Sequence, residues 1–406
     1  MCERRNEQGV NNMTRGKTNP TADGNGRGKS RNTLPPTTVH KNGKSKPVLI
    51  TGGAGFVGSN LAHRLLSSGQ RVRLLDNLSR AGVERNLRWL IETHGNLVDI
   101  EVPDIRNLSI IKTAVKDASQ VFHFAAQVAV TSSLVDPIED FEINARGTLN
   151  LLEAIRATEN PPPLIFTSTN KVYGNLSDLE FTKERTRYTP LDQLIQKRGI
   201  DESRPLDFHS PYGCSKGAAD QYVIDFARTY RIPALVFRMS CIYGPHQYGN
   251  EDQGWVAHFV IRSMSGKPIT IYGDGLQVRD ILFIEDLVNA FLLAQQHMKQ
   301  LAGNAFNIGG GPNNTVSLLE LVDLLAELHG GDVSVRFENW RAADQRYYVA
   351  DTSKFSGLTG WQPRVGVNEG VKRLYKWIRT GDDQLATDPL HVANIPAVSA
   401  IAAAKF

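Results

Sequence analysis

From residue 47 to residue 244, short apolar runs alternate with longer stretches whose apolar residues recur at helical spacing. The helical spacing predicts helices over residues 57–68, 107–116, 138–157 and 212–230. Short and almost wholly apolar runs are typical of strands buried on both faces of a sheet. Six runs fit that description: PVLIT, RVRLL, VDIEV, QVFHF, PLIFT and ALVFR. The alternation therefore predicts an α/β fold with a doubly wound parallel sheet.

The order of apolar runs and helical patterns changes after residue 244. Helical patterns at 255–264, 285–297, 317–329 and 367–378 are interleaved with short strands such as PITIY and AFNIG. We interpret this part as a smaller C-terminal α/β lobe that binds the substrate. A long polar insertion at 175–210 is expected to be a loop, with the role of a lid open to it. The expected domains are 47–244 for the sheet, 245–380 mainly for the smaller lobe, and tails at 1–46 and 381–406.

Charge is unevenly distributed along the 406 residues, whose formal net charge is +4. Residues 1–46 hold ten Lys/Arg against three Asp/Glu, lack hydrophobic periodicity and are expected to form a disordered basic tail. A solvated appendage is favoured over a nucleic-acid contact. No apolar run is long enough to predict a membrane span. Three cysteines are too sparse for a disulfide framework and favour a reducing, cytoplasmic setting.

The stretch ITGGAGFVGSN places Gly52, Gly55 and Gly58 after a strand and at the start of a helix. Such glycines permit a tight turn and the close approach of a pyrophosphate to the helix N-terminus, as in dinucleotide-binding folds. Asp76 ends the next strand and can accept hydrogen bonds from ribose hydroxyls, which favours NAD over NADP, although Arg80 leaves NADP open. The further residues expected at the cofactor are Phe56, Val57, Asn77, Asp104, Ile105, Ala125 and Gln127.

The stretch SPYGCSKGAADQY supplies Tyr212 and Lys216, whose spacing of four places both on one helix face. A nearby ammonium group favours the phenolate and would lower the pKa of Tyr212, making it a usable acid/base. Both residues are also expected to approach the cofactor. TSTNKVYG follows the fifth strand, so the Thr169 hydroxyl is expected beside Tyr212, with Asn170 and Lys171 on the same wall. These polar groups beside a dinucleotide indicate a hydride-transfer site.

Together, TGGAGFVGSN, TSTNKVYG and YGCSK resemble the extended short-chain dehydrogenase/reductase family of nucleotide-sugar epimerases and dehydratases. The resemblance covers about residues 47–380 and implies NAD as cofactor, a nucleotide-sugar substrate, a homo-oligomer and no metal. It also implies that Arg279 in YGDGLQVRD and Arg341 in NWRAADQR bind the nucleotide diphosphate. Thr131 and Gln247 are expected to contact the substrate as well, beside Thr169 and Asn170.

Finer segments, among them DNLSRAG, STNKVYG and LDFHSPYG, resemble the branch of this family that inverts C2 of CDP-linked deoxy sugars. Cys241 stands in RMSCIYG where 4-epimerases usually carry Asn. A 4-epimerase or a dehydratase with the same hydride site is the alternative. Asn170 and Lys171 stand where a dehydratase usually has an acid pair, which disfavours that activity. A non-catalytic NAD-binding or RNA-associated scaffold is a remote alternative that only the basic tail supports.

Overall fold

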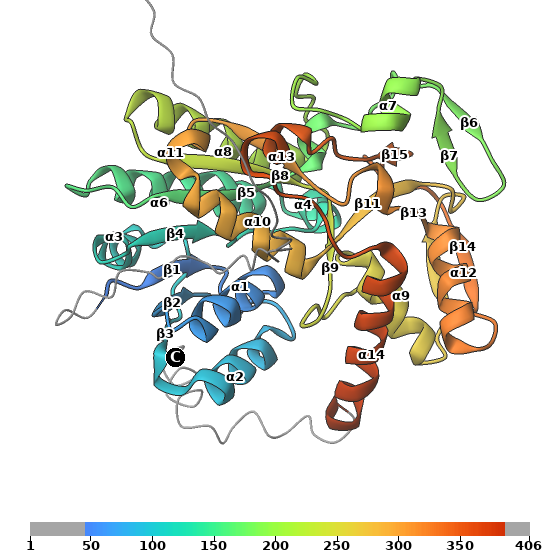
Figure 1. The fold of residues 1–406 in the computed structure, drawn as a ribbon, viewed down its shortest axis with the longest axis horizontal. Coiled ribbons are helices and arrows are strands. Elements are labelled where there is room, and N and C mark those ends of the chain that lie inside the picture. The colour runs from blue at the N-terminus through green and yellow to red at the C-terminus, as the bar shows by residue number, and fades with distance from the viewer. Residues whose placement is uncertain (1–44, 386–406) are drawn as a thin grey trace, which may run out of the picture. The chain divides into compact units, whose positions relative to one another are not determined.

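The structure, a computed structural model, describes residues 45–385. Its central element is a seven-stranded sheet with the order β12-β8-β5-β4-β1-β2-β3, in which all neighbouring strands are parallel (Figure 1). The strands are β1 (Val48–Thr51), β2 (Val72–Leu75), β3 (Val98–Glu101), β4 (Gln120–His123), β5 (Leu164–Thr169), β8 (Ala234–Met239) and β12 (Ala305–Ile308). The order reverses between β1 and β4, and such a switch point is where α/β sheets bind ligands. The prediction of a doubly wound parallel sheet is confirmed.

The seventh strand corrects one expectation. AFNIG was expected in the smaller lobe, but β12 pairs in parallel with β8, from Ala305 opposite Val236 to Ile308 opposite Met239. All four residues of β12 are buried, as a strand covered by helices requires. The chain therefore returns from its C-terminal half to complete the main sheet.

Helices cover both faces of this sheet. One face packs against α1 (Phe56–Ser67), α2 (Val83–His94) and α10 (Ile284–Gln296), and the other against α3 (Leu108–Lys116), α6 (Gly147–Arg156) and α8 (Ser210–Thr229). Alternate strand residues enter the two cores, so that Ile50 faces the first set and Leu49 the second. Of these six helices, α2 was not predicted.

The single helix expected over 138–157 is interrupted. It begins as α5 (Pro137–Phe141), passes through a π-helical segment (Glu142–Arg146) and continues as α6; the short α4 (Val130–Val135) precedes it. π-Helical segments inside α-helices are frequent at functional sites. This one lies on the side of the molecule where the candidate catalytic residues gather.

The smaller lobe has two small sheets. β10 (Ile269–Tyr272) pairs with β14 (Val335–Glu338), and β11 (Val278–Phe283) pairs with β9 (Cys241–Tyr243), β13 (Thr315–Ser317) and β15 (Tyr347–Tyr348). The remaining helices are α9 (Trp255–Met264), α11 (Met298–Leu301), α12 (Leu318–His329), α13 (Ser353–Thr359) and α14 (Val367–Leu385). Helix α14 continues past residue 380, into the segment expected to be a tail.

The insertion at 175–210 is more ordered than a loop. It contains β6 (Phe181–Lys183), β7 (Tyr188–Pro190) and α7 (Gln193–Arg198), after a 3-10 turn at Asn170–Tyr173. Backbone hydrogen bonds tie it to the later chain, from Ile200 N to Val349 O (2.7 Å) and from Asp351 N to Ile200 O (2.8 Å). The expectation of a loop is therefore wrong for most of the insertion, and the role of a lid stays a prediction.

Several expectations fall outside residues 45–385. They concern nearly all of the basic tail, Cys2 and most of the C-terminal tail. Within the described range, no helix is long and apolar enough to span a membrane, and no group of His, Cys, Asp or Glu has the arrangement of a metal site. The cytoplasmic setting stays a prediction.

Candidate active site

The turn between β1 and α1 cannot tolerate side chains at two of its glycines. Gly52 has φ of 69°, and a Cβ there would lie 2.7 Å from Ala125 N. A Cβ on Gly58 would lie 2.3 Å from the carbonyl oxygen of Gly52. Within the described chain, no side chain caps the start of α1, whose N-cap residue is Gly55. The turn therefore presents uncapped backbone N–H groups and a positive helix end, as an anion site requires.

Asp76, at the end of β2, faces this turn. Its carboxylate accepts hydrogen bonds from Ala54 N (3.0 Å) and Leu78 N (2.9 Å). Burial raises the pKa of Asp76, while these backbone contacts and nearby Arg80 oppose the increase. The proximity of Arg80 to Asp76 means that a cation and an anion both border the expected ribose position. The choice of NAD over NADP therefore does not follow from Asp76 alone.

A cavity of about 510 Å³ lies beyond β1 and extends to the start of α8. All the residues predicted at the cofactor line it: Gly52, Gly55, Phe56, Val57, Gly58, Asp76, Asn77, Arg80, Asp104, Ile105, Ala125, Gln127, Tyr212 and Lys216. Ser168 also lines it, and its buried hydroxyl has no hydrogen-bond partner among the described residues. A long cavity joining a glycine turn to an unpaired hydroxyl fits a dinucleotide.

Tyr212 lies in the first turn of α8 and is 8% exposed. Burial raises the pKa of its phenol to about 12, although a hydrogen bond with the Thr169 side chain and the charge of Arg80 lower it. The predicted lowering of this pKa by Lys216 is wrong for this structure, because burial outweighs the favourable contacts. The pairing of Thr169 with Tyr212 stays a prediction.

Lys216 lies one turn further along α8 and is 4% exposed. Its Nζ donates a hydrogen bond to Thr167 O (2.7 Å) and lies 4.3 Å from the centre of the Phe166 ring. Burial lowers the pKa of Lys216 to about 7, with Asp220 and Asp140 opposing the shift. Lys216 is thus held against β5, close to the neutral–charged transition at physiological pH.

Sequence reasoning missed a polar cluster behind these residues. Asn144, in the π-helical segment, accepts a hydrogen bond from Gln127 N (2.9 Å) and donates to Ser215 Oγ (3.1 Å). Asp140 accepts hydrogen bonds from Ser215 and from Gln127 Nε2. The cluster connects the cofactor cavity with α8. Asp140 and Asn144, four apart and therefore on one helix face, were the available signal.

His123 was also missed. It ends β4, is fully buried, and bridges Thr51 Oγ1 (2.6 Å) and Thr148 Oγ1 (3.0 Å). Burial, followed by the charge of Lys216, lowers the pKa of His123 to about 3, so the imidazole is neutral. It joins the strand before the glycine turn to α6. Its position in the apolar run QVFHF made it indistinguishable from a core histidine.

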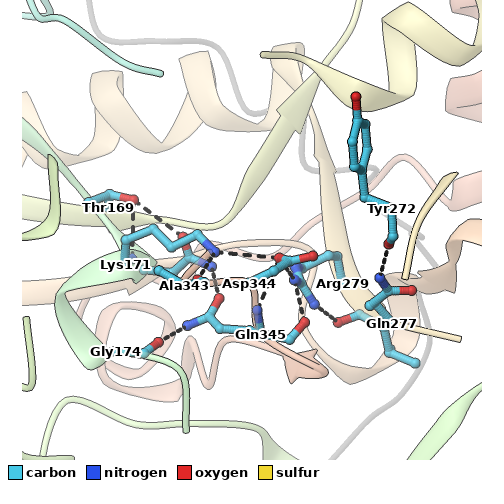
Figure 2. A network of polar contacts seen from close by, with 11 residues as sticks. Thr169, Lys171, Gly174, Tyr272, Gln277, Arg279, Ala343, Asp344 and Gln345 are labelled. Carbon is cyan, nitrogen blue, oxygen red and sulfur yellow. Dashed lines mark hydrogen bonds and ion pairs between the residues drawn. The ribbon is translucent and has the colours of Figure 1, made fainter. Parts of the chain in front are cut away.

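The residues predicted at the substrate fall into two groups, and of them only Gln247 lines the cavity. The first group surrounds the turn after β5 (Figure 2). Asn170 Nδ2 donates to Gln345 Oε1 (3.2 Å), and Gln345 in turn donates to Gly174 O. Arg279 donates to Gln345 O and pairs with Asp344 (2.8 Å), so its guanidinium lies against the segment before β15.

The second group lies around Asp252, which lines the cavity. Thr131 Oγ1 donates to Asp252 (2.9 Å), and Arg341 lies 3.9 Å from the same carboxylate. The Arg341 guanidinium also lies 3.9 Å from the centre of the Tyr272 ring. Arg279 and Arg341, both predicted at the diphosphate, therefore each have a carboxylate partner. Their roles at a substrate stay predictions.

The model of the NAD dependent epimerase/dehydratase family matches residues 48–309. The chain therefore belongs to this family of enzymes, and its cofactor is NAD. Among curated proteins, it is 45% identical over 339 residues to CDP-paratose 2-epimerase of Salmonella typhi, an alignment that covers 81% of this chain and 98% of that protein. It is 30% identical to a putative UDP-glucose 4-epimerase of Methanocaldococcus jannaschii, covering 82% and 99% of the two chains.

Solved structures of similar fold include the UDP-glucose 4-epimerase of Thermotoga maritima with UDP-glucose. That comparison gives a TM-score of 0.70 and 31% identity, and covers 82% of this chain and 99% of that one. The UDP-glucuronic acid 4-epimerase of Bacillus cereus, solved with UDP-glucuronic acid and NAD, gives a TM-score of 0.71 and 26% identity with the same coverage. The similarity thus spans both the sheet and the smaller lobe.

Proposed function

We propose that the protein inverts C2 of a CDP-linked deoxy sugar, converting CDP-paratose to CDP-tyvelose or a close analogue by transient oxidation. The 45% identity to CDP-paratose 2-epimerase over nearly all of that protein supports the substrate and the carbon. The observation that carries the chemistry is that Tyr212 and Lys216, one helical turn apart on α8, line the same cavity as the glycine turn, with Lys216 Nζ bound to Thr167 O in β5. We assign Thr169, Tyr212 and Lys216 as the catalytic residues.

Oxidation is needed because the hydrogen on C2 has no adjacent carbonyl and is not acidic enough to be removed as a proton. Bound NAD supplies the hydride acceptor, a positive charge that favours phenolate, and later the hydride donor. Tyr212 takes the proton of the C2 hydroxyl as the hydride leaves, and Thr169 holds the reacting oxygen through its hydroxyl. The 2-keto sugar then turns over, and Tyr212 returns the proton when hydride reaches the opposite face.

The test of this mechanism is the substitution Tyr212→Phe, with Tyr222→Phe as the matched control. Both tyrosines lie on α8, but Tyr222 is 44% exposed and does not line the cavity. Because positioned acid–base groups contribute about 10²- to 10⁴-fold, the rate of C2 inversion should fall by at least about 100-fold in the Tyr212 variant alone. NMR spectroscopy of the product sugar measures the rate. Inversion within about tenfold of the wild-type rate would contradict the assignment.

A nucleotide-sugar 4-epimerase is the second candidate, favoured by the 31% identity to the Thermotoga maritima enzyme over 82% of this chain. Incubation with CDP-paratose, UDP-glucose and dTDP-glucose, followed by stereochemical analysis of C2 and C4, separates the two activities. Inversion at C2 of the CDP sugar supports our proposal. Inversion at C4 of a UDP sugar, without inversion at C2 of the CDP sugar, would reject our proposal in favour of a 4-epimerase.

The protein is also proposed to be a homo-oligomer. Four large apolar side chains, Leu134, Val135, Ile138 and Phe141, are 50%, 86%, 75% and 51% exposed along α4 and α5. Covering them with a second copy would remove four large apolar side chains from solvent. Light scattering after size exclusion should show an oligomer that Ile138→Glu weakens. A monomeric wild-type protein would rule the proposal out.

A further inference from the structure

Lys171 connects the catalytic end of β5 with Arg279. Its backbone N–H donates to Thr169 Oγ1 (3.2 Å), the hydroxyl that we assign to catalysis. Its side chain runs away from Thr169, and its Nζ donates to Ala343 O (3.2 Å) and lies 3.7 Å from Asp344 Oδ1 (Figure 2). The backbone of Lys171 is therefore bound to the Thr169 hydroxyl. Its ammonium group shares the carboxylate of Asp344 with Arg279, the arginine predicted to bind the diphosphate.

The charges at this point are unbalanced. Asp344 pairs with Lys171 and with Arg279, and in the described part of the chain no other carboxylate lies within 4.0 Å of either cation. Burial lowers the pKa of Lys171, Asp344 opposes the shift and Arg279 adds to it. Two cations sharing one carboxylate in a low-dielectric site favour the binding of a further anion.

The chemistry of a 2-epimerase defines where that anion must be. C2 is bonded to C1, and C1 carries the diphosphate through its glycosidic oxygen. Bringing C2 to Thr169 and Tyr212 therefore brings the sugar-linked phosphate close to them. In a 4-epimerase the reacting carbon lies across the ring from C1, and the phosphate is correspondingly more distant. A cation two residues after the catalytic threonine is suited to the first arrangement.

We propose that Lys171 binds the phosphate attached to sugar C1 and so presents C2, in preference to C4, to Thr169 and Tyr212. This inference rests on the proposed function, since it takes a nucleoside diphosphate sugar as the substrate. Arg279 would hold the diphosphate from the smaller lobe, and Lys171 would hold it from the β5 side. Asp344 would remain to balance the second cation.

The test compares CMP with CDP, which differ by the phosphate that Lys171 is proposed to bind. Calorimetry with the NAD-loaded enzyme measures both affinities in the wild type, Lys171→Met, Lys171→Arg and Lys354→Met. Lys354 is the control, because its Nζ also donates to a backbone carbonyl, Ala305 O (2.9 Å), but outside the site. Melting temperatures establish that each variant is folded.

We expect CDP to bind the wild type more tightly than CMP. Lys171→Met should weaken CDP by about tenfold to a hundredfold, the usual range for a charge-assisted hydrogen bond, and leave CMP within about twofold. Lys171→Arg should recover most of the loss, and Lys354→Met should change neither affinity. The same Lys171→Met variant should show a raised KM for the CDP sugar.

Equal weakening of CMP and CDP, or no change in either, would overturn the assignment, as would a wild type that binds the two nucleotides equally. If Lys171→Met does not fold, the affinities of Lys171→Arg and of the wild type for CMP and CDP decide the outcome. Failure of the proposed function has a different signature. Tighter binding of UDP than of CDP would reject the CDP substrate, and the UMP–UDP pair would then test the same phosphate contact.

Discussion

Mild acid should destabilise the fold through His246, which precedes Gln247 at the cavity. Its imidazole stacks on Trp89, with ring centres 3.6 Å apart, and lies 5.1 Å from the Trp377 ring. Burial, and then the nearby His63, lower the pKa of His246 from 6.5 to about 4. Between these values the unfolded chain binds the proton more strongly than the folded chain. Stability contributed by the neutral ring is therefore lost as the pH falls through this window.

The size of the effect follows from the two pKa values. Going from about pH 6.5 to about pH 5 should cost about 1.6 kcal/mol of unfolding free energy at this one site. Urea unfolding of the wild type and of His246→Phe at both pH values measures it, because phenylalanine can stack on Trp89 without binding a proton. The variant should lose about 1.6 kcal/mol less than the wild type. His329→Phe, at an exposed position on α12, serves as the control.

Comparing losses between two pH values removes any constant effect of the substitution on stability. If the His246 variant and the wild type lost the same free energy on acidification, the ring would not be held neutral by its surroundings. His123, which has a lowered pKa but is not among the causes of the His246 shift, contributes equally to both proteins and cancels in the comparison.

Two further substitutions test the fold at the site. Gly58→Ala should weaken NAD binding by about tenfold to a hundredfold, because its Cβ would lie 2.3 Å from Gly52 O. Gly357→Ala is the control and should not weaken NAD binding, because the space around Gly357 is open. Calorimetry measures the affinity of both variants for NAD. Arg238→Met should cost about 3–5 kcal/mol of unfolding free energy in urea, since it leaves the fully buried Asp220 without its ion-pair partner. A loss below about 1 kcal/mol would contradict the buried pair.

The sequence predicted most of the main sheet, because strands buried on both faces are continuous apolar runs. It failed where an element depends on distant chain. The four residues of β12, three of them apolar, carry no information about whether they join β8 or a strand of the smaller lobe. The π-helical segment was likewise invisible, and the two hydrogen bonds of its Asn144 with Gln127 join residues 17 apart, which no local pattern records.

The candidate site was predictable in its residues but not in its electrostatics. The spacing of four predicted Tyr212 and Lys216 on one helix face. Thr169 was predicted beside them because ligands bind at the carboxyl ends of parallel strands. Their pKa values depend on burial by residues from several elements, which no local pattern records. The partners of Arg279 and Arg341 were hidden for the same reason, because Asp344 and Asp252 reach them through the tertiary fold.

Because β12 comes about 70 residues after β8 in the chain but pairs with it, the main sheet is complete only when both segments are present. This affects folding during synthesis and the design of fragments. A fragment ending near residue 244 would leave one edge of β8 without its partner strand, and an open, largely apolar strand edge is a template for aggregation. During synthesis, that edge stays open until residue 308 has left the ribosome. We therefore expect an N-terminal fragment to be soluble only when β12 is grafted onto it.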